Sequence, residues 1–114
     1  MKVTLTLPYP ISTNRYWRFT KYKGVHVSHE AKEYKSQVRN ICWLAGMKPT
    51  DGAVDLKLKL VPRGERHMDL DNCLKITLDA LQGLAYWNDR QVRKIFAEIA
   101  PAEKDHPRLE VEIG

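Results

Sequence analysis

The sequence predicts an α+β fold, in which a small mixed, mainly antiparallel sheet of about four strands carries two main helices. Two kinds of pattern predict it: apolar and polar residues alternate in short segments, and two longer segments repeat apolar residues at three- and four-residue steps. The half-polar strands further indicate a sheet with helices on one face only. The 114 residues are enough for one modest core, so a single domain over residues 1–114 is expected.

The expected strands are short and half-buried. They cover residues 2–7, 54–60, 92–100 and 108–113. Alternation is clearest in 54–60, where apolar residues alternate with Asp55, Lys57 and Lys59. Pro8 and Pro10 end the first strand.

The expected helices lie in the middle of the chain. The first begins after the N-cap Ser28 and stops at Gly46. Its core-facing stripe is expected to be Ala31, Tyr34, Val38, Ile41 and Ala45. The second covers about residues 70–84 and is apolar around most of its circumference, apart from a narrow line of Asp71, Lys75, Asp79 and Gln82. We expect that polar line in a cleft or at an interface. Residues 11–27 are expected to be irregular, with a short hairpin around Gly24.

Composition excludes several classes of protein. Hydrophobic residues make up 43% and charged residues 29%, which is typical of a globular domain and not of a disordered chain. No apolar run approaches the ~20 residues that cross a bilayer, and the N-terminus lacks the features of a signal peptide, so an intracellular, cytoplasmic protein is expected. Cys42 and Cys73 form no CxxC pair, which fits reduced thiols.

Positive charge is concentrated in the first half of the chain. Residues 1–50 hold nine basic and two acidic side chains, whereas residues 51–114 hold ten and twelve. A basic half of this kind is typical of a protein that binds a polyanion, with a solvated surface as the alternative.

The most informative stretch runs from His67 to Lys75. Asp69 and Asp71 lie where a loop meets the second helix, and a helix N-terminus favours negative charge. Asp89 follows in the turn after that helix. Hard carboxylate oxygens with open positions beside them are what Mg²⁺ binds, with Mn²⁺ as an alternative ion. The pattern therefore predicts a metal site of Asp69, Asp71 and Asp89.

Phosphodiester hydrolysis is the chemistry that fits this site. A bound metal ion activates water and neutralises charge on phosphate oxygens. Lys75 lies one helical turn from Asp71 and is expected to stabilise the transition state or hold the attacking water.

Simpler interpretations stay open for each of these residues. Asp69 can be an N-cap, Asp71 can pair with Lys75 four residues on, and Asp89 can belong to a turn. Asp79 is expected to be structural, as the ion-pair partner of Lys75. Cys73 is expected in the core.

A basic-aromatic segment covers residues 14–26. It interleaves four cations with four aromatic residues, a combination that contacts phosphates and stacks on exposed bases. The expected nucleic-acid contacts are Asn14, Arg15, Tyr16, Trp17, Arg18, Lys21 and Lys23, joined by Arg63, Arg66 and His67 ahead of the acidic cluster. A loop anchored by its aromatic residues is the alternative.

Together these residues resemble the RusA family of Holliday junction resolvases of bacteria and their phages. The resemblance covers nearly the whole chain, and its specific part is the D-x-D-N-x-x-K group from Asp69 to Lys75, followed by Asn88-Asp89. The segments Asn14–Arg18 and Asp79–Leu81 support it. One departure is His67-Met68, where the family often carries basic residues.

The resemblance implies a dimeric, Mg²⁺-dependent endonuclease that nicks four-way DNA junctions symmetrically. It assigns metal binding to Asp69, Asp71 and Asp89, and names Lys75 as the essential lysine. A homodimer also follows from the reaction, because two matched cuts need two carboxylate sets related by a two-fold axis. The alternatives are a non-catalytic module that binds branched nucleic acid, and a nuclease acting on other DNA or RNA structures.

Overall fold

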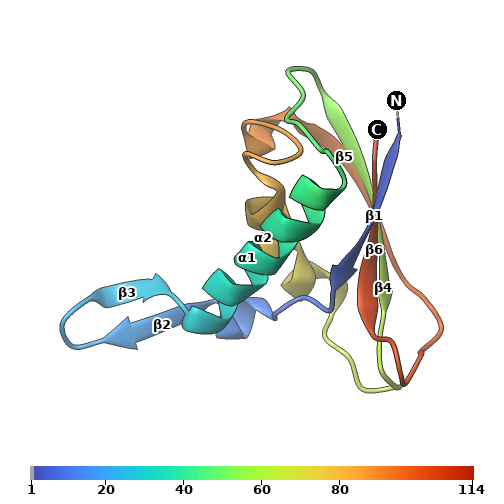
Figure 1. The fold of residues 1–114 in the computed structure, drawn as a ribbon. Helices are drawn as coiled ribbons and strands as arrows, with labels where there is room; N and C mark the ends of the chain where they lie inside the picture. The colour runs from blue at the N-terminus through green and yellow to red at the C-terminus, as the bar shows by residue number, and fades with distance from the viewer. Residues whose placement is uncertain (1) are drawn as a thin grey trace.

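A computed structural model describes residues 2–114 and contains the predicted mixed sheet (Figure 1). Four strands lie in the order β1-β6-β4-β5. The strands are β1 (Val3–Pro8), β4 (Val54–Val61), β5 (Val92–Ile99) and β6 (Arg108–Ile113). β6 runs antiparallel to both β1 and β4, whereas β4 and β5 are parallel. The predicted α+β class is therefore confirmed.

Two helices cover one face of this sheet. They are α1 (His29–Leu44) and α2 (Leu70–Leu81), and in Figure 1 both lie on the same side of the strands. α2 and the 3₁₀ turn η2 (Asp89–Gln91) belong to the long connection that the parallel pair β4–β5 requires. None of the helices in the described range is long and apolar enough to cross a membrane.

The core lies between the helices and the sheet. The alternation predicted for β4 is observed, since Val54, Leu56, Leu58 and Leu60 are buried and the residues between them are exposed. Buried residues of the other layer include Tyr34 and Val38 of α1 and Ile76 and Leu81 of α2. Cys42 and Cys73 are buried free thiols, and burial was expected for Cys73.

Both helices differ from the prediction at their C-terminal ends. α1 stops at Leu44, so Ala45 is exposed at the C-cap and Cys42 takes its place in the buried stripe. α2 stops at Leu81 and not near residue 84, because Gln82 is extended and Gly83 has a φ of 84°. Glycine adopts a positive φ without the steric cost of a Cβ, so Gly83 favours this early end.

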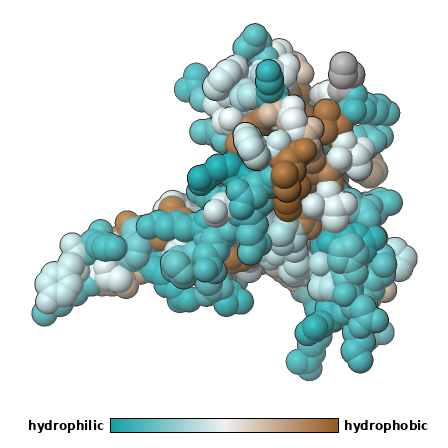
Figure 2. All heavy atoms as spheres, in the orientation of Figure 1, coloured by the Kyte–Doolittle hydropathy of each residue, from teal (hydrophilic) through white to brown (hydrophobic). Residues whose placement is uncertain are grey.

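The predicted hairpin around Gly24 is an arm that extends away from the body (Figure 1). It consists of β2 (Trp17–Thr20) and β3 (Gly24–Val27) and follows the short 3₁₀ turn η1 (Thr13–Arg15). Ser28 fixes its base: this buried N-cap of α1 accepts from Ala31 N and donates to Arg15 O at 2.8 Å. Hydrophilic side chains cover most of the arm and much of the body in Figure 2.

Candidate functional site

The start of α2 presents two carboxylates to solvent. Asp69 is the N-cap in extended conformation, and Asp71 lies in the first helical turn. Both residues are exposed, at the positive end of the helix dipole. The predicted position of this pair, at the junction of a loop and a helix, is confirmed.

The simpler interpretations of these two aspartates are not observed. Asp69 makes no side-chain capping hydrogen bond, although it occupies the N-cap position. Lys75 pairs with Asp79, with 3.2 Å between Nζ and Oδ2, and not with Asp71. Within residues 2–114 the carboxylates of Asp69 and Asp71 thus have neither a hydrogen bond nor an ion pair.

Asp89 is also exposed and unpaired within the described residues. Its neighbours make the turn: Asn88 caps η2 by accepting from Arg90 N at 2.9 Å, and Gln91 accepts from the backbone of Trp87 and Asn88. Asp89 contributes only its backbone: its N–H donates to Gln82 Oε1 at 3.2 Å, and its C=O accepts from Val92 N. Turn formation therefore does not explain its carboxylate.

The structure does not bring Asp89 to the other two carboxylates. Its hydrogen bond to Gln82 places it at the C-terminal end of α2. The eleven residue-to-residue steps from Asp71 to Gln82 span about 16 Å at the helical rise of about 1.5 Å per residue. In Figure 1 the chain runs along α2 to the orange turn at its far end.

The expected convergence within one chain is therefore wrong. No group of three or more His, Cys, Asp or Glu residues within 2–114 is placed to hold a metal ion. The separation follows from the length of α2, which lies between the two acidic segments. The sequence prediction did not take this length into account. The assignment of Asp69, Asp71 and Asp89 as metal ligands stays a prediction.

The residues present at the start of α2 fit a divalent cation in part. Asp69 and Asp71 offer hard oxygen ligands whose charge nothing else in the described residues neutralises. Mg²⁺ typically takes one or two protein carboxylates and completes its shell with waters and substrate phosphate. The two carboxylates at this helix start thus match the number of ligands that a protein usually supplies to Mg²⁺.

Lys75 lies between the carboxylates and the base of the arm. Its ammonium group lies 5.8 Å from the ring centroid of Tyr16 and 5.9 Å from that of Trp17. Asp79 is the structural partner expected from the sequence, and Tyr16 donates to the same oxygen of Asp79 at 2.6 Å. The first turns of α2 and the basic-aromatic segment therefore form one cluster.

The basic-aromatic segment divides into buried and exposed parts. Tyr16 is only 1% exposed, so the prediction that it contacts nucleic acid is wrong: its ring is an anchor. Burial, together with the hydrogen bond to Asp79, raises the pKa of Tyr16. Trp17 is half-exposed, and two aromatic residues absent from the predicted contacts, Phe19 and Tyr22, are 75% and 95% exposed. A two-stranded arm exposes both of its faces, so the alternation of apolar and polar residues did not identify Phe19 and Tyr22 as exposed.

The cations of the arm differ in availability. Arg15 and Arg18 both pair with Glu30 of α1, whereas Lys21 and Lys23 at the tip have no ion pair within residues 2–114. Asn14 lies exposed in η1. Their roles in DNA binding stay predictions.

The loop before α2 keeps its predicted character. Arg63, Arg66 and His67 are exposed there, and His67 Nδ1 lies 2.9 Å from Met68 O. The loop leads directly into Asp69. The contacts of its basic residues with DNA stay predictions.

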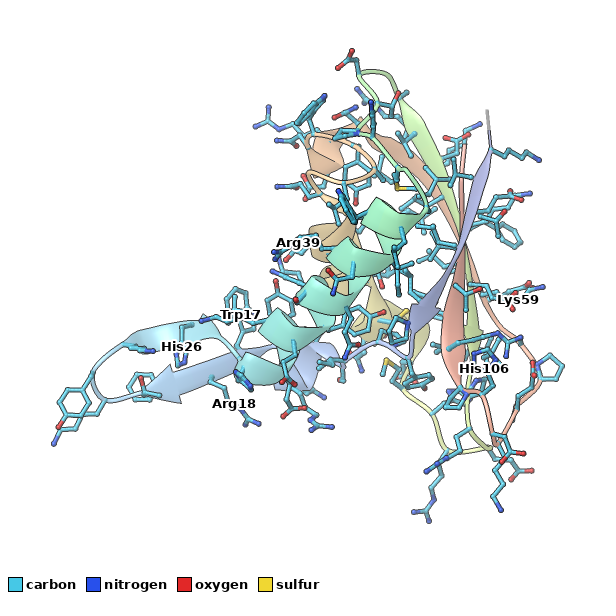
Figure 3. All side chains as sticks on the ribbon, viewed as in Figure 1. Trp17, Arg18, His26, Arg39, Lys59 and His106 are labelled. Carbon is cyan, nitrogen blue, oxygen red and sulfur yellow. The ribbon has the colours of Figure 1, made fainter. Side chains whose placement is uncertain are left out.

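Two cations that the sequence did not single out line a groove between the helices. The groove has a volume of about 190 Å³ and is lined by Lys35 and Arg39 of α1 and by Asp79, Gln82 and Gly83 among others. Neither cation has an ion pair within residues 2–114. In Figure 3 the labelled Arg39 and Trp17 both lie to the left of α1, above the arm. Lys35 directly follows buried Tyr34, and Arg39 directly follows buried Val38. Because the two cations are four residues apart, they lie on the same side of the buried stripe of α1.

Comparisons with known proteins agree with the resemblance seen in the sequence. A family model described as endodeoxyribonuclease RusA matches residues 8–114. A crossover junction endodeoxyribonuclease RusA of Escherichia coli strain K12 is 36% identical over 89 residues, covering 75% of this chain and 72% of the relative. The protein of the same name from Enterobacteria phage 82 is 34% identical over 88 residues, covering 75% and 71%.

Proposed function

The chain belongs to the RusA family of endodeoxyribonucleases, and we propose that it is a homodimeric, Mg²⁺-dependent resolvase of four-way DNA junctions. The observation that carries this proposal is the pair of unpaired carboxylates, Asp69 and Asp71, at the N-terminus of α2. Capping, pairing and turn formation do not account for them. Relatives from bacteria and a phage further favour a bacterial cytoplasm as the place of action.

The chemistry divides between a metal ion and the chain's own groups. Asp69 and Asp71 would hold Mg²⁺, which when bound lowers the pKa of a coordinated water and neutralises charge on phosphate oxygens. The ammonium group of Lys75, one helical turn from Asp71, stabilises the negative charge that builds on the phosphate in the transition state.

A dimer serves both the paired cuts and the site itself. Junction resolution needs two cuts related by a two-fold axis, which an isologous dimer supplies. Asp89 lies at the far end of α2 from Asp69 and Asp71. We infer that it completes a site only from a second copy of the chain.

The DNA-binding surface combines three features. The arm offers exposed Trp17, Phe19 and Tyr22 for stacking on bases at the branch point. Lys21 and Lys23 at its tip, and Lys35 and Arg39 in the groove, offer unpaired charge for phosphates. Arg63 and Arg66 extend this charge to the start of α2.

The direct test incubates a labelled four-way junction with the protein and Mg²⁺, with an EDTA control. We expect metal-dependent nicks placed symmetrically in two opposed strands. Binding without nicks would favour a non-catalytic module. Equal cutting of forks, flaps or RNA in a matched panel would contradict the proposed preference for four-way junctions but not the proposed hydrolysis.

A mixed-dimer experiment tests how Asp89 contributes. Asp71→Asn and Asp89→Asn chains are each expected to be inactive as homodimers. If Asp89 acts from the partner, mixing the two variants creates dimers with one intact site, and single nicks reappear. If all three aspartates act within one chain, every mixed dimer stays inactive, which would contradict the shared site.

A further inference from the structure

Lys75 has two carboxylates within its reach on α2. Asp71 lies four residues before it and Asp79 four residues after it. On an isolated helix, an acid that precedes a lysine by four residues forms the better pair. Helix geometry alone therefore favours Asp71, yet Lys75 Nζ lies 3.2 Å from Asp79 Oδ2. Contacts from outside the helix must select Asp79.

Tyr16 supplies one of those contacts. Its hydroxyl donates to Asp79 Oδ2 at 2.6 Å, the same oxygen that Lys75 approaches. This hydrogen bond fixes the position of the carboxylate, which is only 22% exposed. Since burial and the carboxylate both raise the pKa of Tyr16, the hydroxyl keeps its proton and remains a donor at neutral pH.

The aromatic rings supply the second contact. The ammonium group of Lys75 lies within 6 Å of the ring centroids of Tyr16 and Trp17, a distance at which a cation is attracted to a ring face. The Tyr16 backbone is held in turn by buried Ser28, whose N–H donates to Tyr16 O at 2.8 Å. The backbone of Tyr16, and with it the buried ring, is thus held at the base of the arm.

The choice of partner has a chemical consequence. An ion pair between Lys75 and Asp71 would neutralise one of the two carboxylates that nothing else in the described residues engages. It would also draw the ammonium group away from the base of the arm, where the DNA backbone is expected. Keeping Lys75 on Asp79 leaves Asp71 available to a cation and holds the ammonium group at the base of the arm.

We propose that Tyr16 and Asp79 are positioning residues that hold Lys75 away from Asp71, so that the carboxylate and the ammonium group act separately. The inference rests on the proposed function in assigning a cation to Asp71 and a phosphate to Lys75. Neither Tyr16 nor Asp79 needs to touch the DNA in this role.

The first test is structural and needs no activity. Crystal structures of the metal-free protein and of its Asp79→Asn variant would be compared. We expect Nζ of Lys75 within about 4 Å of the Asp71 carboxylate in the variant, the distance of an ion pair. If Lys75 instead stays against the rings or extends into solvent, the inference is overturned, whether or not the protein cuts junctions.

The second test measures single-turnover junction cleavage against Mg²⁺ concentration. In Tyr16→Phe and Asp79→Asn, the Mg²⁺ concentration for half-maximal rate should rise about threefold or more, because Lys75 competes for Asp71 with the energy of an exposed ion pair. Junction affinity in EDTA should fall by no more than the share of one phosphate contact, because only Lys75 moves. An unchanged Mg²⁺ requirement in both variants would also overturn the inference.

A matched variant separates this effect from a general loss of stability. Tyr34 is another buried tyrosine, and its hydroxyl donates to Pro8 O at 2.7 Å, away from Lys75. Tyr34→Phe should lower the melting temperature about as much as Tyr16→Phe and leave the Mg²⁺ requirement unchanged. An equal shift in both variants would assign the effect to stability and contradict the positioning role.

Discussion

Asp71 and Asp79 lie on the same helix, at equal distance in sequence from Lys75, yet their environments differ. Asp79 is mostly buried and binds both Tyr16 and Lys75, whereas Asp71 is exposed and has no partner within the described residues. A carboxylate removed from water needs such partners, because an unpaired buried charge is costly. A carboxylate left in water without partners contributes little to the fold and keeps its oxygens available for a ligand.

The comparison predicts its largest effect for Asp71→Asn. Cleavage should fall at least about 100-fold, or about 2.7 kcal/mol of transition-state stabilisation, because a metal ligand loses its charge. Junction affinity and stability should change little. Single-turnover kinetics, gel-shift binding and urea denaturation measure the three quantities.

Asp55→Asn is the matched control for that experiment. Asp55 is an exposed aspartate of β4 whose side chain is unpaired within the described residues, and it lies outside the proposed site. The Asp55→Asn variant should cleave junctions at the wild-type rate. Cleavage by Asp71→Asn at the wild-type rate would remove the chemical distinction between the two aspartates of α2.

For stability, in contrast to cleavage, the larger effect is expected at Asp79. Asp79→Ala should lower the free energy of unfolding by about 1–3 kcal/mol, because it leaves the buried Tyr16 hydroxyl without its acceptor. Asp71→Ala should lower it by less than about 0.5 kcal/mol. Urea denaturation of both variants at one pH checks the difference, and equal losses would contradict it.

Cations extend the same comparison from acids to bases. Lys35 and Arg39 line the groove without an ion pair in the described range, whereas Arg15 and Arg18 share Glu30. Replacing Lys35 or Arg39 by Gln should lessen the slope of log affinity against log salt by about one unit each. Arg18→Gln should lessen it by less, since Glu30 already balances part of its charge. Equal slopes for all these variants would show that ion pairing in the free protein does not predict phosphate contact.

Local pattern predicted the fold well. Alternation in β4 and the caps of α1 depend on neighbours in sequence, so residues 54–60 and Ser28 were placed almost as observed. The end of α2 was missed by three residues, because the backbone freedom of Gly83 outweighs the continuing apolar pattern.

The site was less predictable because it depends on distances in space. Asp69 and Asp71 share a helix start, which the sequence indicates, but the length of α2 separates them from Asp89. Tyr16 belongs to a basic-aromatic segment that suggests stacking, and only its contact with Asp79 identifies it as an anchor. Glu30 of α1 forms ion pairs with two predicted DNA contacts, Arg15 and Arg18, and nothing in their own segment indicates this partner.

The smallest expected effect belongs to Asp69. Replacing an N-cap aspartate by alanine usually costs about 1 kcal/mol, but Asp69 makes no side-chain capping hydrogen bond. Asp69→Ala should therefore lower stability by less than about 0.5 kcal/mol, whereas Ser28→Ala, which removes a working cap from α1, should lower it by about 1–2 kcal/mol. Thermal and urea unfolding of the two variants measure the contrast. A loss for Asp69→Ala as large as that for Ser28→Ala would mean that its carboxylate caps α2 in solution, and its oxygens would then be less available to a metal ion.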